Sequence, residues 1–251
     1  MQKPRTSKHA VSRRTVVKGS LMAAALGGTG TTKRKFFFPP DVVLTKNYDV
    51  VLDITGDREH PLLTQKATSI VNRFYMVKDT NVGGNASTWT PVRDDTSSTA
   101  DVEPTALFHV TDSVPYNGTL SGFYRTLSGS GEKGVNAPTT VGGTVYFGTN
   151  QPIVPSTTSC QANLGSARSY GINFLTGSAT SKLLDGGGLA PSPVFGIVTV
   201  NVNGTNRQLP FLIGGGGGSG ADGKSGLGAQ KPIIPLNATR KRTYWFRETD
   251  R

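Results

Sequence analysis

Short runs of alternating apolar and polar residues, separated by polar or glycine-rich turns, fill much of the chain from Phe36 onward. Alternation with a period of two is typical of half-buried β-strands. The runs recur as a unit: a proline, an apolar strand, a polar turn, a second apolar strand, and then Gly or Thr-Gly before a long loop. Copies of this unit begin at Pro40, Pro138 and Pro193. The pattern therefore predicts three antiparallel strand pairs.

The turn residues within each unit support this assignment. The first unit turns at Thr45-Lys46-Asn47, the second at Gly142-Gly143 and the third at Asn203-Gly204. Gly-Gly and Asn-Gly suit two-residue hairpin turns, because both turn positions require positive φ. The predicted strand pairs are 40–44 with 48–54, 138–141 with 144–149, and 194–202 with 208–213. The first two units also gain a third strand after a long loop, over residues 72–79 and 168–177.

The spacing of the units predicts the architecture. Pro40 and Pro138 are 98 residues apart, which is two intervals of 49, and Pro193 follows Pro138 by 55 residues. A sheet that repeats every ~50 residues is typical of a β-propeller with four-stranded antiparallel blades. Residues 106–111 then represent a weak blade remnant between the first two units. A β-sandwich is the alternative, but its turns recur every 8–12 residues or so without the longer period. We expect an all-β fold, an incomplete propeller of about four blades.

Composition narrows the class of protein. No apolar run approaches the roughly 20 residues that a membrane-spanning helix needs. The 32 glycines and 15 prolines among 251 residues indicate many turns between short strands, and they exclude a coiled coil or a helical bundle.

The net charge of +11 resides in the two ends of the chain. Residues 1–35 contain nine cations and no acid, and residues 240–251 contain five cations and two acids. Residues 36–239 contain the remaining 13 cations and 14 acids, a net charge of −1. A nucleic-acid binder would be expected to have basic residues along its folded surface. We therefore expect no nucleic-acid partner.

The N-terminal segment has its own pattern. Residues 12–18, Ser-Arg-Arg-Thr-Val-Val-Lys, resemble a twin-arginine export signal, and a short apolar stretch follows over 21–26. Ala23-Ala24-Ala25 offers a small-residue cleavage site. The alternative is an accidental start of a truncated reading frame, and the sequence leaves both open. We separate residues 1–32, signal-like or disordered, from residues 33–251, a partial C-terminal propeller domain.

Residues suited to metal, redox or nucleotide chemistry are sparse. Cys160 is the only cysteine, and His9, His60 and His109 are far apart, so zinc and thiol motifs are absent. Residues 218–225 fit the Gly-x-x-x-x-Gly-Lys-Ser spacing of a phosphate-binding loop. Glycines and Pro232 follow at once and would break the helix that such a loop must begin, so we interpret this run as a flexible loop.

Five short sequence segments, called phrases below, lie at residues 35–43, 55–61, 72–76, 142–149 and 167–177. Taken together and in this order, these phrases resemble segments of the C-terminal β-propeller of PilY-type proteins. PilY-type proteins are surface-exposed adhesin and biogenesis factors at the tip of bacterial type IV pili. The resemblance covers roughly residues 33–251. It implies a non-enzymatic role in pilus assembly, in countering retraction, in surface adhesion and in twitching motility. It also implies export to the cell surface or pilus, with minor pilins, other pilus components and host or abiotic surfaces as partners.

The chain departs from that family in two ways. PilY-type proteins are much longer, with a full ring of blades and often a region resembling a von Willebrand A domain. They also contain a calcium loop of alternating Asp and Asn, whereas residues 79–83 match only the first two ligands of such a loop. The acidic residues Asp94, Asp95, Asp101 and Glu103 have the wrong spacing. We therefore assign no catalytic, cofactor or metal-binding residue, and calcium belongs to the resembled family alone.

Two other functions stay open at this stage. A quinone-dependent dehydrogenase shares the propeller fold, and Asp53, Asp57 and Trp89 are residues of the types that it uses, without a matching motif. A secreted surface- or carbohydrate-binding module could use Asp57-Arg58-Glu59-His60 as a polar corner, or Tyr244-Trp245-Phe246 as a binding face. The structural alternatives are a hydrogen-bonded blade corner and a closing strand. Because an incomplete ring leaves strand edges uncovered, we expect self-association.

Overall fold

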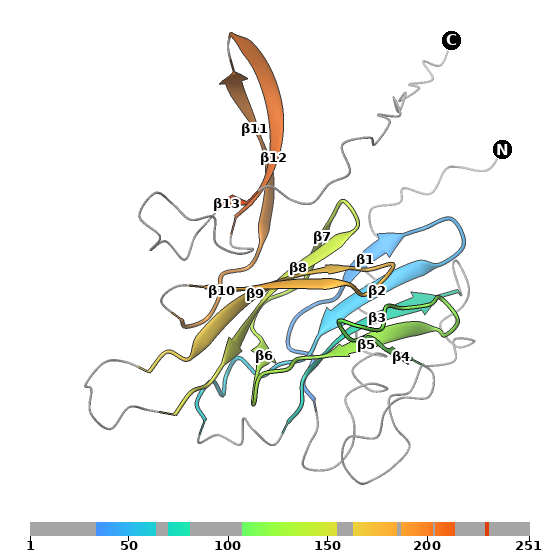
Figure 1. Cartoon of the computed structure of the whole chain (residues 1–251), viewed down its shortest axis with the longest axis vertical. Coiled ribbons are helices and arrows are strands. Elements are labelled where there is room, and N and C mark those ends of the chain that lie inside the picture. The colour runs from blue at the N-terminus through green and yellow to red at the C-terminus, as the bar shows by residue number, and fades with distance from the viewer. Residues whose placement is uncertain are drawn as a thin grey trace, which may run out of the picture.

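The computed structural model describes residues 34–63, 70–80, 107–154, 163–184, 187–202, 204–213 and 229–230. These residues form thirteen strands in three sheets (Figure 1). None of them lies in a helix, and so none forms a helix long and apolar enough to cross a membrane. The prediction of an all-β fold is confirmed for the described part of the chain.

The first sheet has the strand order β1-β2-β3-β5-β4. Its strands are β1 (Asp41–Leu44), β2 (Asp49–Ile54), β3 (Arg73–Asp79), β5 (Gly122–Thr126) and β4 (Phe108–His109). β1, β2, β3 and β5 form three successive antiparallel pairs, and β4 pairs with β5 in parallel. The predicted strands of the first unit are confirmed, while β5 was not predicted. The segment interpreted as a blade remnant, residues 106–111, instead contributes β4 to this first sheet.

The second sheet is built on the second unit. It contains β10 (Ala179–Leu184), β9 (Ser166–Asn173), β8 (Thr144–Gln151), β7 (Thr139–Val141) and β6 (Lys133–Gly134). The order is β10-β9-β8, and both β7 and β6 pair with the other edge of β8. Gly142 and Gly143 have φ of 60° and 90°, so the β7–β8 turn is the positive-φ turn that Gly-Gly predicts. Neither β6 nor β10 was predicted.

The third sheet is a long hairpin with a short addition. β11 (Val194–Val202) and β12 (Thr205–Ile213) pair along their whole length, and β13 (Ala229–Gln230) pairs with the end of β12. Val202 pairs with Thr205, and Gly204 just before Thr205 has a φ of 79°, which agrees with the predicted position of the turn. Figure 1 shows this hairpin, in orange, extending away from the first two sheets.

The first two sheets pack face to face around one aromatic core. Apolar residues alternate along β2, so that Val50, Leu52 and Ile54 all belong to this core. At its centre, the ring of Phe147 stacks on Phe74 of the first sheet and on Tyr170 of its own sheet, with ring centroids 5.3 Å apart in both pairs. Burial of each large apolar side chain contributes about 1.5–3 kcal/mol. The core therefore stabilises the contact between the two sheets.

The edges of the two sheets are also connected through backbone groups. Gly134 N, in β6, donates to Thr55 O at 3.0 Å. A Cβ atom at Gly56 would lie 2.1 Å from Gly134 O, so only glycine permits this approach. At the other end, Thr140 N donates to the Asp41 carboxylate at 2.7 Å. The first contact joins segments 79 residues apart in sequence, and the second joins segments 99 residues apart.

The sheets agree with the predicted strand units, but they do not by themselves distinguish a propeller from a sandwich. β1-β2-β3-β5 and β7-β8-β9-β10 are four-stranded antiparallel runs, the size of a propeller blade. Two sheets packed face to face are also found in a sandwich. Among the described residues there are three sheets, none of which closes. The described part of the 98-residue interval after Pro40 contains all five strands of the first sheet and the short strand β6 of the second, instead of two blade units. The propeller therefore stays a prediction.

Candidate functional site

The polar corner at residues 57–60 follows β2 and is organised around one carboxylate. Asp57 Oδ2 accepts from Lys35 Nζ at 2.5 Å and lies 2.8 Å from His60 Nδ1. Asp57 Oδ1 accepts from the Glu59 backbone N at 3.2 Å. Partial burial favours the neutral carboxyl group, but the hydrogen bonds and charges of Lys35 and His60 outweigh it and lower the pKa of Asp57. Asp57 thus closes the turn as a carboxylate.

A second lysine connects this corner to the other sheet. Lys133, in β6, donates from Nζ to His60 O at 2.5 Å, and burial lowers the pKa of Lys133 against the opposing effect of Asp57. Asp57, Glu59 and His60 do offer three possible metal-ligand atoms within 4.8 Å of one another. The ammonium of Lys35 contacts the same Asp57 oxygen, however, and would compete with a cation there. The corner is arranged as a hydrogen-bonded turn, which agrees with its structural interpretation.

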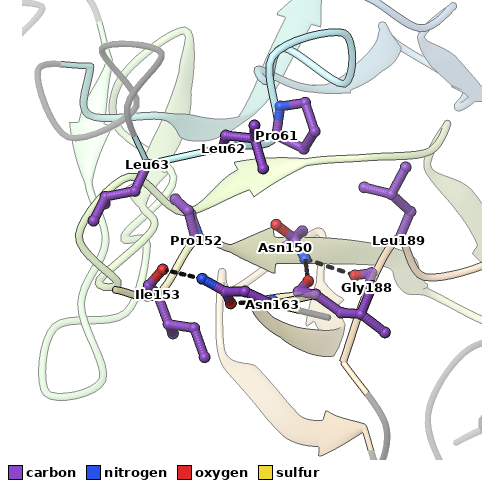
Figure 2. A pocket seen from close by; sticks show the side chains of 11 residues that line it. Pro61, Leu62, Leu63, Asn150, Pro152, Ile153, Asn163, Gly188 and Leu189 are labelled. Carbon is purple, nitrogen blue, oxygen red and sulfur yellow. Dashed lines mark hydrogen bonds between the residues drawn. The ribbon is translucent and has the colours of Figure 1, made fainter. Parts of the chain in front are cut away.

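A pocket begins where the corner ends. Its volume is about 280 Å³, and it lies between the loop after β2 and the loops at one end of the second sheet (Figure 2). The lining is mostly apolar and consists of Pro61, Leu62, Leu63, Asn150, Pro152, Ile153, Asn163, Leu164, Gly165, Gly188 and Leu189. Several of these side chains are open to solvent: Leu62 is 52% exposed, Ile153 45% and Leu164 55%. The pocket thus presents a partly exposed apolar surface formed by loops of both sheets.

Two asparagines hold the walls of the pocket in place. Asn150 Nδ2 donates to Leu164 O at 3.0 Å and to Gly188 O at 2.6 Å. Asn163 Nδ2 donates to Ile153 O at 2.7 Å. The two amides are drawn with these bonds in Figure 2. Both amide groups are engaged with the loop backbone, and the described lining contains no ionisable side chain. The pocket is therefore suited to an apolar group of a ligand or surface.

The other sequence candidates lie apart from this pocket. Asp53 is fully buried in β2, where Oδ1 accepts from Ile54 N at 2.7 Å and Oδ2 has no hydrogen-bond partner. Burial raises the pKa of Asp53 well above its usual value, opposed by the bond from Ile54. His109 stacks on Tyr124 at 4.6 Å in the first sheet. Asp79 ends β3 and is buried, but residues 81–83 of its partial calcium motif lie outside the described residues.

Further predictions fall outside the described part of the chain. They are the N-terminal segment, Trp89, the acidic cluster at 94–103, Cys160, the glycine run with residues 218–225, and Tyr244-Trp245-Phe246.

Sequence reasoning missed a buried carboxylate network that joins the loop before β6 to β8 and β9. Glu132 is 1% exposed, and it accepts from Thr149 Oγ1 at 2.6 Å, from Tyr170 Oη at 2.9 Å and from Gly129 N at 2.9 Å. Burial, and then the charge of Glu132, raise the pKa of the Tyr170 phenol. A lone Glu in a Gly-Ser loop gives no sequence signal of this kind. The network fixes the loop between the sheets.

Comparison with known proteins gives little beyond the geometry. No protein-family model matches the chain, and no curated protein does. Among solved structures, the chain is similar to the C-terminal domain of PilY1 from Pseudomonas aeruginosa, with 15% sequence identity and a TM-score of 0.45. The alignment covers 75% of this chain and 47% of that domain, so the chain spans about half of the domain's length.

Proposed function

We propose that this chain is a non-enzymatic, pilus-associated adhesion and assembly protein of the PilY type, built on part of a β-propeller. The observation that carries the proposal is the set of family-like phrases, which occur in order and span most of the chain. Four of them coincide with structural elements: 35–43 with β1, 72–76 with β3, 142–149 with the β7–β8 hairpin, and 167–177 with β9. The fifth, 55–61, forms the polar corner and the start of the pocket.

The position of these phrases supports a shared scaffold. Four of the five phrases contain strand residues of the first two sheets. Here they include the central strands of both packed sheets and the glycine turn between β7 and β8. Within this scaffold we assign surface contact to the pocket, because its lining is mostly apolar, partly exposed to solvent and supplied by loops.

Gene deletion and complementation test the proposal. Deletion should reduce piliation, surface attachment and twitching, and the intact gene should restore all three. Unchanged piliation, attachment and twitching in the deletion strain would contradict a pilus role. Dye-linked alcohol oxidation by the purified protein with added quinone and calcium would contradict the non-enzymatic part.

A matched pair of substitutions tests the pocket. Leu164 lines the pocket at 55% exposure, whereas Leu175 has 57% exposure in the turn after β9 and does not line it. Leu164→Asp should reduce attachment while leaving piliation intact, and Leu175→Asp should leave both intact. Equal attachment by the two variants would remove the pocket from the adhesion surface, while the pilus role would still be judged by the deletion.

A further inference from the structure

The outer edge of the hairpin is unusual among the strand edges of this protein. β11 pairs with β12 on one side, and no described strand pairs with its other side. The backbone groups along that side can accept a further strand. Nine residues are available, from Val194 to Val202, which is longer than a typical strand.

The other edge strands either contain a charged residue or a proline, or are only two or three residues long, as β4, β7 and β13 are. β1 begins with Asp41 and β10 contains Lys182. The sequence of β12 includes Arg207 and Pro210, and proline has no amide hydrogen to donate to a further strand. The β11 sequence, Val-Phe-Gly-Ile-Val-Thr-Val-Asn-Val, contains no charge and no proline. Charges, prolines and short strands are the devices by which natural sheets avoid edge pairing, and β11 has none of them.

Large apolar side chains are also exposed along β11. Val194 is 59% exposed, Phe195 38%, Ile197 61% and Val198 40%. These residues alternate between the two faces of the hairpin, so both faces present apolar surface to solvent. β13 pairs with only two residues of β12, so the hairpin is two-stranded over most of its length, and a two-stranded hairpin is marginally stable at best in water. The hairpin therefore gains from additional strands at its free edge.

We propose that β11 is a homodimerisation strand, which joins its free edge to β11 of a second copy of this chain in antiparallel register. The register that pairs all nine residues has a twofold axis at Val198. It places Val198 opposite Val198 of the second copy, Ile197 opposite Thr199 and Val194 opposite Val202. A four-stranded sheet, β12-β11-β11-β12, results.

The strand itself favours a second copy as the occupant. A twofold contact brings each residue type against its symmetry mate, so any charge near the axis would repel its copy. β11 contains no charge at any position, and its centre and ends are valines, which suit close cross-strand pairs. A strand without charge offers an acidic or basic partner no complementary group. The inference concerns the purified chain alone and does not depend on a pilus role.

Charge insertion at the axis tests the dimer. Sedimentation velocity of the full chain should show a concentration-dependent dimer. Val198→Lys places two ammonium groups opposite each other and should weaken dimerisation at least tenfold. Leu183→Lys is the matched control, because Leu183 lies in edge strand β10 with 53% exposure, and it should leave the dimer intact. A monomer at every concentration, or equal dimerisation of both variants, would overturn the proposal.

Cysteine cross-linking tests the register and does not depend on how well Val198→Lys folds. In a Cys160→Ser background, Val198→Cys should form an intermolecular disulfide under mild oxidation. Val194→Cys should not, because the two copies of residue 194 would be eight residues apart along the strand, about 26 Å. Equal cross-linking at both positions would mean non-specific association. No cross-link at Val198 in a dimeric sample would place the interface elsewhere, for instance with residues 231–251 covering β11.

Discussion

Replacement of Phe147 by alanine should remove much of the stability that the two packed sheets share. The Phe147 side chain is fully buried and stacks on Phe74 at an interplanar angle of 14° and on Tyr170 at 11°. Removal of a buried phenylalanine side chain costs about 3–5 kcal/mol through lost transfer energy and the cavity that remains. Each aromatic pair contributes about 0.5–1.5 kcal/mol beyond burial, so the loss of two pairs favours the upper part of this range. We therefore expect Phe147→Ala to lower the free energy of unfolding by about 4–5 kcal/mol.

Urea unfolding followed by far-UV circular dichroism measures this loss. Phe147→Leu keeps most of the apolar volume and should cost only about 1–2 kcal/mol, which keeps the series measurable if the alanine variant is largely unfolded. Phe37 is the control, because it is 42% exposed, and Phe37→Ala should cost less than about 1 kcal/mol. A loss below about 1.5 kcal/mol for Phe147→Ala would refute a shared core between the two sheets.

Four further substitutions test other parts of the structure by urea unfolding. Gly56→Ala should lower the free energy of unfolding by about 3 kcal/mol or more, because the added Cβ would lie 2.1 Å from the backbone of β6. Gly171→Ala is the control and should cost much less, because the nearest atoms to its Cβ are side-chain atoms at 3.3 Å. Asn136→Ala should cost about 2–3 kcal/mol, because a fully buried amide loses hydrogen bonds to three backbone groups; a cost under about 0.5 kcal/mol would contradict this. Asp57→Asn should lose up to about 1 kcal/mol near pH 7. That difference should vanish as pH falls through the lowered pKa of Asp57, since the carboxylate stabilises the fold only above it, and a pH-independent difference would argue against the charge. For Asp53 the pH dependence is opposite, because its raised pKa means that the native state retains the proton. The free energy of unfolding should therefore fall as pH rises from about 4 through that pKa. Asp53→Asn should reduce this dependence of stability on pH.

The strands that could be predicted are those with local signals. β2, β8 and β11 are apolar runs next to turn residues, and the two-residue turn at 142–143 is determined by the positive φ that glycine permits. β5 escaped prediction because Gly-Phe-Tyr-Arg-Thr is short and has no turn pair beside it. Its place is determined by pairing with β3, more than forty residues earlier in sequence. The exposed strand β10 was missed for a similar reason. Its sequence, Ala-Thr-Ser-Lys-Leu-Leu, does not alternate apolar and polar residues, and its place is determined by pairing with β9.

The candidate site was less accessible from sequence than the fold. The polar corner was identified by its density of charged residues, but its partner Lys35 lies twenty-two residues before Asp57, and no local pattern connects the two positions. The pocket is assembled from loops of both sheets, and its residues are ordinary apolar and asparagine positions. Such a surface depends on tertiary arrangement, which no local pattern records.

The contrast between sequence neighbours and distant neighbours has a consequence for the kinetics of folding. Within the second sheet, β7 pairs with β8, β8 with β9 and β9 with β10. Each pair consists of strands that follow each other along the chain, so this meander requires only short or moderate loop closures. The stacked pair Phe74 and Phe147 in the core joins residues 73 positions apart, and the bond from Thr140 N to Asp41 joins residues 99 positions apart. Contacts of such high sequence separation form slowly, because the loop-closure entropy must be overcome before they stabilise anything. Docking of the first sheet onto the second should therefore limit the refolding rate, with each meander formed before the core closes.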